Sequence, residues 1–346
     1  MERRRFLTLT AGVVAGAALL PAVPAHAARP LRVLVVTNEP WGTYHIKSIL
    51  DEAAAARPAP RWEVALVVPD RSGVTPTDPV PVVTLAEAAH WGADLLVVNG
   101  ATAWPTQVVQ TLTGLPVVAS SFAYLTPVEA AGAASIRPRI VAMTAASTSE
   151  AAVFAAHFGL PASRVRVIGN INLDDLPPYR PTPRTALIAT SVTYPSSTGG
   201  AAPGTQVLLD SAAALAAAGW HIRVGLHPRE NPALWSQYER ATEGTLMAST
   251  TAEVTVGIPG SVFPQIAAVG CPLVGIVVPG LTVPPYILAL CAQAGSVPEV
   301  LTAVEARALP TPEVMTSSVG PVGGSGDRLW KIWRQSAAPY GQRRSA

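Results

Sequence analysis

The sequence has little charge and almost no lysine. Charged side chains make up 13% of its 346 residues, and the lysines are only Lys47 and Lys331. The 24 basic and 22 acidic residues leave a formal net charge of +2. Proteins that bind nucleic acid by neutralising phosphates carry a clear basic surplus, which is missing here. We therefore expect no nucleic-acid partner.

Cysteine is also scarce. Cys271 and Cys291 are too few for a disulfide framework or a cysteine metal site. One disulfide in an exported protein and two isolated buried thiols are both open, and the sequence favours the thiols. The six histidines and the carboxylates show no metal-ligand spacing. The sequence therefore predicts no metal and names no cofactor.

No segment has 18 unbroken apolar residues, so we expect no stable membrane span in the mature chain. Residues 1–28 nevertheless have the parts of a secretory signal. A basic head containing Arg3, Arg4 and Arg5 precedes a short apolar run, and Ala25-His26-Ala27 forms an A-x-A cleavage site. The arginines followed by Phe6-Leu7 resemble a twin-arginine (Tat) signal. We expect an exported protein; a short N-terminal membrane anchor is the alternative.

Apolar strands alternate with helical segments along the rest of the chain. Leu31–Thr37 is a run of β-formers followed by a turn and a helix-compatible stretch at Tyr44–Ala56. The alternation continues to Ile168, and a second series starts at Thr185. This pattern is typical of parallel, doubly wound sheets. The sequence predicts an α/β fold with two Rossmann-like domains that face each other across a cleft.

A stretch with four prolines, residues 176–184, is the best candidate for a linker between these domains. It separates an expected N-terminal domain, residues 29–175, from an expected C-terminal domain, residues 185–312. The remaining residues, 313–346, begin with a region rich in glycine and serine. They predict a flexible tail with a short helix over 327–335.

The first candidate for a functional loop is TNEPWGTYH, residues 37–45. It follows the first strand, where open α/β sheets bind their ligands. Trp41 and Tyr44 can stack on a ring, and His45 can act as a base. A turn with an aromatic cover and a surface histidine is the alternative.

Two further loops follow strands of the second half. His227 and Arg229 can bind a diphosphate, with the guanidinium as a bidentate partner, or Arg229 can pair with Glu230 at the surface. Gly260 and Ser261 precede a helix, so their N–H groups and the hydroxyl can hold an anion, or they can form a tight turn.

A helix start at Ser147–Glu150 and a turn at Gly169-Asn170 are weaker anion candidates. A purely structural helix–loop–strand unit explains both segments equally well.

Taken together, the two later loops resemble the C-terminal half of GT-B glycosyltransferases. The nearest groups are CDP-glycerol glycerophosphotransferases, capsule-polysaccharide transferases and UDP-N-acetylglucosamine 2-epimerase. In that group a strand ends in His-Pro, matched by His227-Pro228. A later loop with glycine and small residues precedes Gly-x-Pro, matched by Gly257, Gly260-Ser261 and Gly270-Cys-Pro272.

Two positions depart from that pattern at the donor site. The family usually has an acidic residue on the donor-binding helix, suited to a ribose diol, and this chain has Gln265. Gln265 can hydrogen-bond a diol without charge assistance. The first small residue of the family's serine pair is Gly260 here.

The resemblance implies a transferase that moves a sugar or glycerophosphate unit to a hydroxyl of an envelope or exported glycan. The donor would be linked to a nucleotide or to a lipid phosphate. Its phosphate would meet Arg229, Gly260 and Ser261, while His227 would orient a phosphate oxygen or a sugar hydroxyl. His45, from the other domain, would be the base.

A second hypothesis belongs to a different class. Nucleotide-activated sugars are made in the cytoplasm, so an exported enzyme would lack a soluble donor. An exported two-lobe binding protein for a sugar or small polar ligand, without catalysis, fits the same two domains. It predicts two or three chain crossings between the lobes, whereas the transferase predicts mainly the one proline-rich linker.

Overall fold

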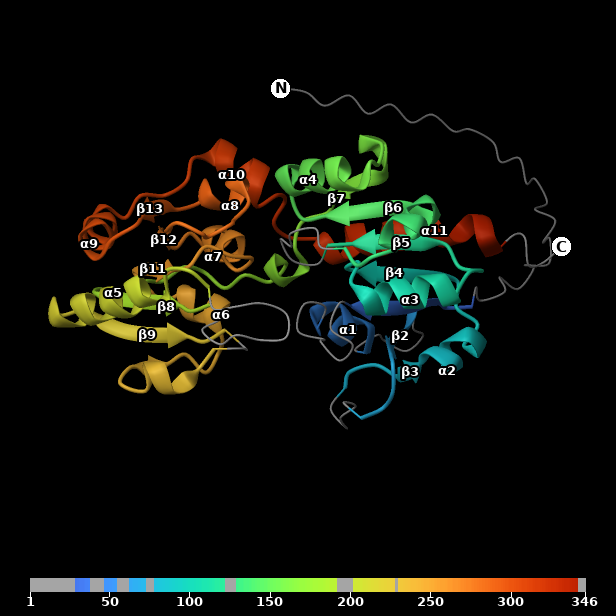
Figure 1. The fold of residues 1–346 in the computed structure, drawn as a ribbon, viewed down its shortest axis with the longest axis horizontal. Coiled ribbons are helices and arrows are strands. Elements are labelled where there is room, and N and C mark those ends of the chain that lie inside the picture. The colour runs from blue at the N-terminus through green and yellow to red at the C-terminus, as the bar shows by residue number, and fades with distance from the viewer. Residues whose placement is uncertain are drawn as a thin grey trace, which may run out of the picture.

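The chain folds into two α/β domains, each built on one sheet whose described strands all pair in parallel. The two domains lie side by side in Figure 1. The expected architecture of two Rossmann-like α/β units is confirmed. The computed structural model describes residues 29–37, 47–54, 62–72, 78–121, 129–191, 202–227 and 230–341.

The first sheet has seven strands in the order β3-β2-β1-β4-β5-β6-β7. Valine and leucine dominate its central strands, which are buried on both faces as parallel strands require. The strands are β1 (Leu31–Thr37), β2 (Trp62–Val68), β3 (Val82–Thr84), β4 (Leu95–Asn99), β5 (Val117–Ser120), β6 (Ile140–Ala145) and β7 (Val165–Val167).

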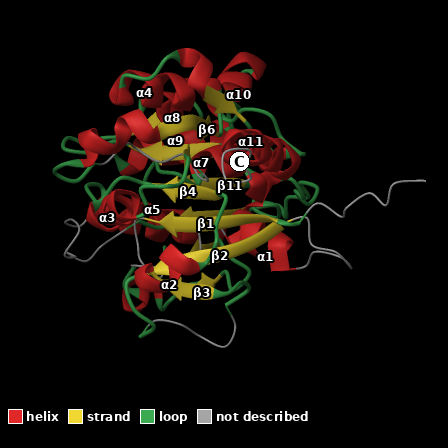
Figure 2. Ribbon diagram, turned by 90° about the vertical axis from the view of Figure 1, so that its right-hand side faces the viewer, coloured by secondary structure: helices red, strands yellow, loops and turns green. Residues whose placement is uncertain are grey.

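Helices cover both faces of this sheet. Figure 2 shows α2 and α3 on one side and α1 and α11 on the other. The helical segments of the domain are α1 (Lys47–Ala54), α2 (Leu85–His90), α3 (Ala103–Thr111), α4 (Thr148–Phe158), α11 (Ser325–Gly341), and the short 3₁₀ turns η1 (Ala133–Arg139), η2 (Ala162–Arg164) and η3 (Ile171–Leu173).

The second sheet has six strands in the order β10-β9-β8-β11-β12-β13. Its strands are β8 (Thr185–Ala189), β9 (His221–Gly225), β10 (Glu239–Arg240), β11 (Val254–Gly257), β12 (Leu273–Ile276) and β13 (Ala292–Ala294). Its helices are α5 (Thr205–Ala217), α6 (Thr245–Ser249), α7 (Phe263–Val269), α8 (Pro285–Leu288), α9 (Val297–Ala306) and α10 (Pro312–Ser318), with a 3₁₀ turn η4 (Pro232–Trp235).

Both sheets reverse their strand order beside the first strand. The reversal lies between β1 and β4 in the first sheet and between β8 and β11 in the second. Ligands of open α/β sheets bind outside the carboxyl ends of the strands at such a switch point. In Figure 1 the arrowheads of β6 and β9 each point toward the other domain. The two switch points therefore open toward the same interdomain region.

The chain crosses between the domains twice. The first crossing, residues 174–184, is tied to the second domain, where the N–H groups of Arg180 and Thr182 each donate a 2.8 Å hydrogen bond to a backbone carbonyl. The second crossing, residues 319–325, returns to the first domain and ends at α11. There the Asp174 carboxylate accepts hydrogen bonds from the N–H groups of Ser325 and Gly326, both at 2.8 Å.

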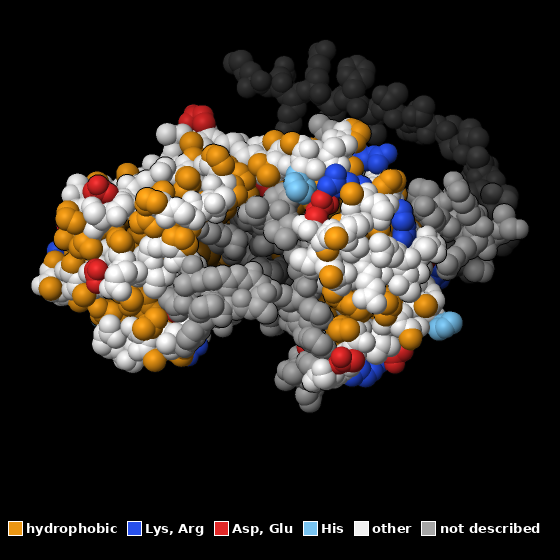
Figure 3. Space-filling model, in the orientation of Figure 1, with side chains coloured by type: hydrophobic (Ala, Val, Ile, Leu, Met, Phe, Trp, Pro, Cys, Tyr) orange, Lys and Arg blue, Asp and Glu red, His pale blue; other side chains and the backbone are white. Residues whose placement is uncertain are grey.

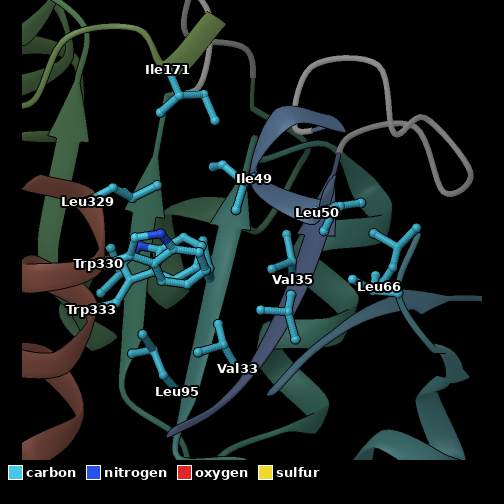
Figure 4. Packing of buried hydrophobic residues seen from close by; sticks show 14 of the residues in the cluster. Val33, Val35, Ile49, Leu50, Leu66, Leu95, Ile171, Leu329, Trp330 and Trp333 are labelled. Carbon is cyan, nitrogen blue, oxygen red and sulfur yellow. The ribbon is translucent and has the colours of Figure 1, made fainter. Parts of the chain in front are cut away.

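The C-terminal residues differ from the expected flexible tail with a short helix. Residues 313–341 contain most of α10 and the 17-residue α11. Leu329, Trp330, Trp333 and Ala337 are spaced to share one helix face, and all four are buried in the core of the first domain. Figure 4 shows Trp330 and Trp333 packed beside Leu95. The Asp174 carboxylate also complements the positive end of α11.

Candidate functional site

At the carboxyl edge of the second sheet, hydrogen bonds of Thr190 link the ends of β8 and β9. Thr190, the residue after β8, donates from its backbone N–H to the carbonyl of Gly225 at 3.1 Å. Its hydroxyl accepts a 2.9 Å hydrogen bond from the N–H of His227. Thr190 thus fixes the start of the loop that carries His227. Sequence reasoning missed Thr190, because one polar residue after a strand looks like any loop residue.

The loop after β9 forms a tight turn with a buried carboxylate. His227 is half-buried, and its carbonyl accepts from the N–H of Glu230 at 2.9 Å. Glu230 is only 7% exposed, and its carboxylate accepts from the N–H of Asn231 at 2.6 Å. Pro228 and Arg229 lie outside the described residues. The phosphate contact of Arg229 and its pairing with Glu230 both remain predictions.

The loop after β11 carries the other predicted donor residues. The N–H of Phe263 donates to the carbonyl of Gly260 at 3.0 Å, so Gly260 and Ser261 form a turn and α7 begins only at Phe263. Gln265 donates from Nε2 to the carbonyl of Ser261 at 3.3 Å. Among the described residues, none accepts a hydrogen bond from the N–H of Gly260 or Ser261. These groups are available to a ligand of this turn.

The pairing of the strands sets the spacing of these two loops. Ala189 of β8 pairs with Gly225 of β9 on one side and with Gly257 of β11 on the other. Neighbouring strands lie about 4.8 Å apart, so β9 and β11 are roughly 10 Å apart. His227 and the Gly260–Ser261 turn therefore stand on the two sides of Thr190. Both loops can contact a single ligand at the switch point.

The corresponding loop of the first domain lies outside the described residues. Trp41, Tyr44 and His45 belong to it, so their predicted stacking and base roles stay predictions. The loop starts where Thr37 of β1 pairs with Asn99 of β4, which is the switch point of the first sheet.

Buried polar side chains lie at or next to the carboxyl ends of four adjacent strands of the first sheet. Thr37 pairs with Asn99, Ser120 pairs with Thr144, and Asn99 and Ser120 follow the pair Val98–Ala119. All four of these polar side chains are at most 4% exposed. Asn99 Nδ2, Ser120 Oγ and Thr144 Oγ1 have no hydrogen-bond partner among the described residues. We name this set of four the polar row; sequence reasoning missed it.

The weaker anion candidate at the start of α4 already holds a carboxylate of the chain itself. Glu150 is fully buried there and accepts hydrogen bonds from the Ser121 hydroxyl at 2.7 Å and the Ala146 N–H at 2.6 Å. Ser147 caps the helix by accepting from the N–H of Glu150. A carboxylate at this place excludes a bound anion.

The turn at Gly169 is covered by the second crossing. A Cβ atom on Gly169 would lie 2.2 Å from the carbonyl oxygen of Pro321. The side chain of Arg328 donates to the carbonyl of Ile168 at 2.7 Å. Packing therefore explains this turn, and no room is left beside Gly169 for an anion.

Both cysteines are free thiols in this structure. Burial raises the pKa of Cys271 to about 11 and that of Cys291 to about 12. The thiolate is the reactive form, so neither residue is a nucleophile near neutral pH. The described part of the chain holds no group of three or more His, Cys, Asp or Glu placed to bind a metal ion. None of its helices is long and apolar enough to span a membrane.

No protein-family model and no curated protein sequence matches this chain. Solved structures do match its fold. The wall teichoic acid polymerase TagF, H548A variant, superposes with a TM-score of 0.57 at 10% identity, over 90% of each chain. UDP-GlcNAc 2-epimerase from Neisseria meningitidis, bound to UDP-GlcNAc, gives 0.56 at 13% identity, over 88% of this chain and 100% of that one. The enzyme of the same name from Methanocaldococcus jannaschii gives 0.54 at 13% identity, over 88% and 99%.

Proposed function

We propose, from the GT-B fold that the chain shares with these structures, that it is an exported transferase. It moves a sugar or glycerophosphate unit from a phosphate-activated donor to a hydroxyl of an envelope or exported glycan. The observation that carries the proposal is the second switch point, where His227 and the Gly260–Ser261 turn flank Thr190. A neighbour of the same fold was solved with UDP-GlcNAc bound.

The donor half of the mechanism uses backbone and neutral groups. The N–H groups of Gly260 and Ser261 bind a donor phosphate oxygen, and Arg229 adds a charged, bidentate contact. His227, held by Thr190, orients a second oxygen. Gln265 binds a hydroxyl of the donor. Fixed donors of this kind stabilise the charge that develops on the leaving phosphate.

The acceptor half comes from the first domain. His45 takes the proton of the acceptor hydroxyl, and Trp41 and Tyr44 stack on a sugar ring. Holding donor and acceptor at facing switch points supplies the proximity that transfer requires.

An exported two-lobe binding protein is the second candidate, and one observation favours it. The chain crosses between the domains at residues 174–184 and 319–325, and this hypothesis predicts two or three crossings. The transferase predicts mainly one. The shared fold weighs toward the transferase, because TagF and the epimerases match over both domains.

Calorimetry on the mature chain tests the donor site. UDP-GlcNAc and CDP-glycerol are titrated into the wild type, Arg229→Ala, Ser261→Ala and Arg240→Ala. We expect Arg229→Ala to weaken binding by about 1.5–3 kcal/mol, the range for a hydrogen bond to a charged group. Ser261→Ala has a smaller effect, because the backbone N–H groups remain. Arg240, an exposed residue of β10, is the matched control.

The outcomes separate the two candidates. Equal binding by wild type and Arg229→Ala removes Arg229 from the phosphate site. Binding of a free sugar with no binding of any phosphorylated ligand selects the binding protein. Donor turnover that disappears in His45→Gln, with donor affinity kept, supports transfer with His45 as base.

Export is tested separately. Replacing Arg4 and Arg5 by lysine is expected to hold the precursor inside the cell, because a twin-arginine signal needs its arginine pair. Secretion of the double variant at the wild-type level would leave a general secretory signal.

A further inference from the structure

A pocket in the first domain lies on the sheet face covered by α3, η1 and α4. Val98, Ala119 and Met143 are register partners on β4, β5 and β6, so their side chains share this face and line the floor of the pocket. Phe154 and Phe158 of α4 line its wall and are stacked with ring centroids 5.7 Å apart. The pocket is built from a different domain than the proposed donor site.

The pocket reaches down to the sheet itself. β5 lies inside the sheet, with β4 on one side and β6 on the other, yet Ala119 is only half-buried. Its two register partners, Val98 and Met143, are 5% and 2% exposed. The small side chain of Ala119 therefore leaves a recess in the floor, which the described helices of this face cover only in part.

Three polar residues at the ends of β4 and β5 also line the pocket, but their side chains do not serve it. Asn99 and Ser120 each come one position after a floor residue, so both side chains point to the opposite face of the sheet. The Ser121 hydroxyl donates to the Glu150 carboxylate at 2.7 Å. The described floor and wall therefore give a ligand hydroxyl no side-chain partner.

The charged residues at the pocket are paired with each other. Arg137 donates from Nε to Glu129 Oε1 at 3.1 Å, and His157 Nε2 lies 3.4 Å from Glu129 Oε2. Figure 3 shows a histidine, an acidic and a basic side chain grouped near α4 on this face. Because Glu129 neutralises Arg137, the pocket offers no net charge to an anion or a cation. It fits a neutral group.

The size of this pocket limits what it can hold. Its volume is about 60 Å³. A cavity of about 150 Å³ holds benzene, with six carbon atoms, so this pocket encloses a group of roughly two to four heavy atoms. The group that fits is short, neutral and made of hydrocarbon, and the rest of the ligand stays outside.

The place of the pocket indicates what carries this group. Gly100 and Ala101, which follow β4, line the pocket and are half-buried. β4 forms one side of the first switch point, where the proposed function places the acceptor sugar. A sugar ring at this edge can direct one substituent into the pocket. A hexose has a hydroxymethyl group on C5, whereas a 6-deoxyhexose has a methyl group there.

We propose that this pocket binds the methyl group of a 6-deoxy sugar and thereby selects the class of acceptor glycan. The methyl group packs against Ala119 and Phe154, whereas a hydroxymethyl group would bury its hydroxyl without a partner, which is unfavourable. The inference rests on the proposed function for the sugar as ligand and deepens it by naming the kind of sugar. It does not depend on catalysis, because a sugar-binding protein can use the same pocket.

Saturation-transfer NMR on the mature chain tests the pocket with pairs of sugars that differ only in this group. The pairs are L-fucose and L-galactose, D-fucose and D-galactose, and L-rhamnose and L-mannose. We expect saturation of at least one 6-deoxy sugar, strongest at its methyl protons. Its hydroxymethyl partner is expected to bind on the order of 10–100-fold more weakly, the range for one added hydroxyl in an apolar pocket.

Two substitutions of the floor residue test the pocket in different ways. Ala119→Leu fills the recess and is expected to weaken binding of the 6-deoxy sugar at least about tenfold. Ala119→Ser gives a C6 hydroxyl a partner and is expected to narrow the difference between the paired sugars. Ala134→Leu, at an exposed position of η1, is the matched control and is expected to bind as the wild type does. Thermal unfolding followed by circular dichroism checks each fold, and Ala119→Ser decides alone if Ala119→Leu unfolds.

Several results would overturn the proposal. They are no saturation of any 6-deoxy sugar, equal binding within every pair, and equal binding by wild type and a folded Ala119→Leu. Saturation of prenol that is lost in Ala119→Leu, with none of any 6-deoxy sugar, would assign the pocket to the end of an isoprenoid chain instead. Failure of nucleotide binding, with the preference for the methyl group kept, counts only against the transferase. Nucleotide binding without that preference counts only against this pocket.

Discussion

The two sheets share a strand order around their switch points but carry different side chains at their carboxyl ends. The first sheet ends in the polar row. The second has an almost bare row, in which Gly225, Ala189, Gly257 and Gly275 pair across four strands. The first sheet also needs α11 from the far end of the chain, whereas the second is covered by its own helices.

The two edges therefore differ in the hydrogen-bonding groups that they carry. In the second sheet a Cβ on Gly257 would lie 2.6 Å from the carbonyl oxygen of Ala189, so the backbone is packed closely at this edge. Such an edge presents N–H groups, which suit a phosphate. In the first sheet the Asn99 amide and the Ser120 and Thr144 hydroxyls are buried and have no hydrogen-bond partner among the described residues.

Removing the Trp333 side chain of α11 has the largest expected effect. Trp333 is fully buried between α11 and the first sheet. Trp333→Ala is expected to lower the free energy of unfolding by about 3–5 kcal/mol. Urea unfolding followed by circular dichroism measures it. Leu309→Ala, at a residue that is 60% exposed, is the control and should stay within about 0.5 kcal/mol of wild type.

Adding one methyl group to the bare row comes next. Gly257→Ala brings a Cβ against the carbonyl and side chain of Ala189 and is expected to destabilise by about 1–3 kcal/mol. At Gly114 a Cβ would meet nothing within 4 Å. There the same substitution is expected to stabilise by about 0.4–1 kcal/mol. Equal effects in the urea midpoints would contradict the close packing of the second edge.

A substitution in the polar row is expected to change the free energy of unfolding in the opposite direction. Thr144→Val keeps the shape and removes a buried hydroxyl without a partner, so we expect the free energy of unfolding to rise by about 1 kcal/mol. Ser121→Ala removes the donor to the buried Glu150 carboxylate and is expected to lower it by about 1–3 kcal/mol. If Thr144→Val destabilises the protein, the Thr144 hydroxyl has a hydrogen-bond partner.

The smallest expected effect concerns the N-terminal caps of two helices. In the first domain α2 has a capping box made by Thr84 and Glu87, and α7 in the second has no side-chain cap. Hydrogen bonds from the Arg71 side chain and the Thr84 N–H lower the pKa of Glu87 to about 2.

The sign of the pH effect follows from this shift. A depressed pKa contributes stability above the unfolded value of 4.5, and the contribution is lost as the pH falls toward 2. Glu87→Gln is therefore expected to flatten the acid limb of unfolding slightly over that window. Glu305→Gln on α9 is the control for the loss of one surface charge. An acid limb identical to that of wild type would mean that the cap contributes nothing.

The fold was predictable where buried runs are long. Leu31–Thr37 is a strand with the expected bounds, and the second series of strands starts at Thr185 as expected, because apolar runs rich in β-branched residues and leucine favour buried parallel strands. The three residues of β13 and the two of β10 are too short to give a periodic signal. The middle of α11 was predicted as a short helix over 327–335, but the glycines and serines before it suggested a flexible tail and hid its packing into the first domain.

The candidate site was predictable only in part. A loop that follows a buried strand marks a sheet edge, which is how His227 and Ser261 were identified. The polar row was not visible, because each of its members is a single polar residue at or next to the end of an apolar strand. Only the register between strands brings Ser120 and Thr144 into one line. Sequence spacing carries no information on that register.

Asp174 holds the first turn of α11, which packs on the first sheet. This packing has a consequence for how the polypeptide is made. Synthesis runs from the N-terminus, so the residues of the whole first sheet and the whole second domain are synthesised before Trp333. The second domain can close on itself while the nascent chain is still growing. The first domain, although it is made earlier, keeps part of one sheet face uncovered until α11 is made. The domain that is synthesised first is therefore the domain that completes its fold last.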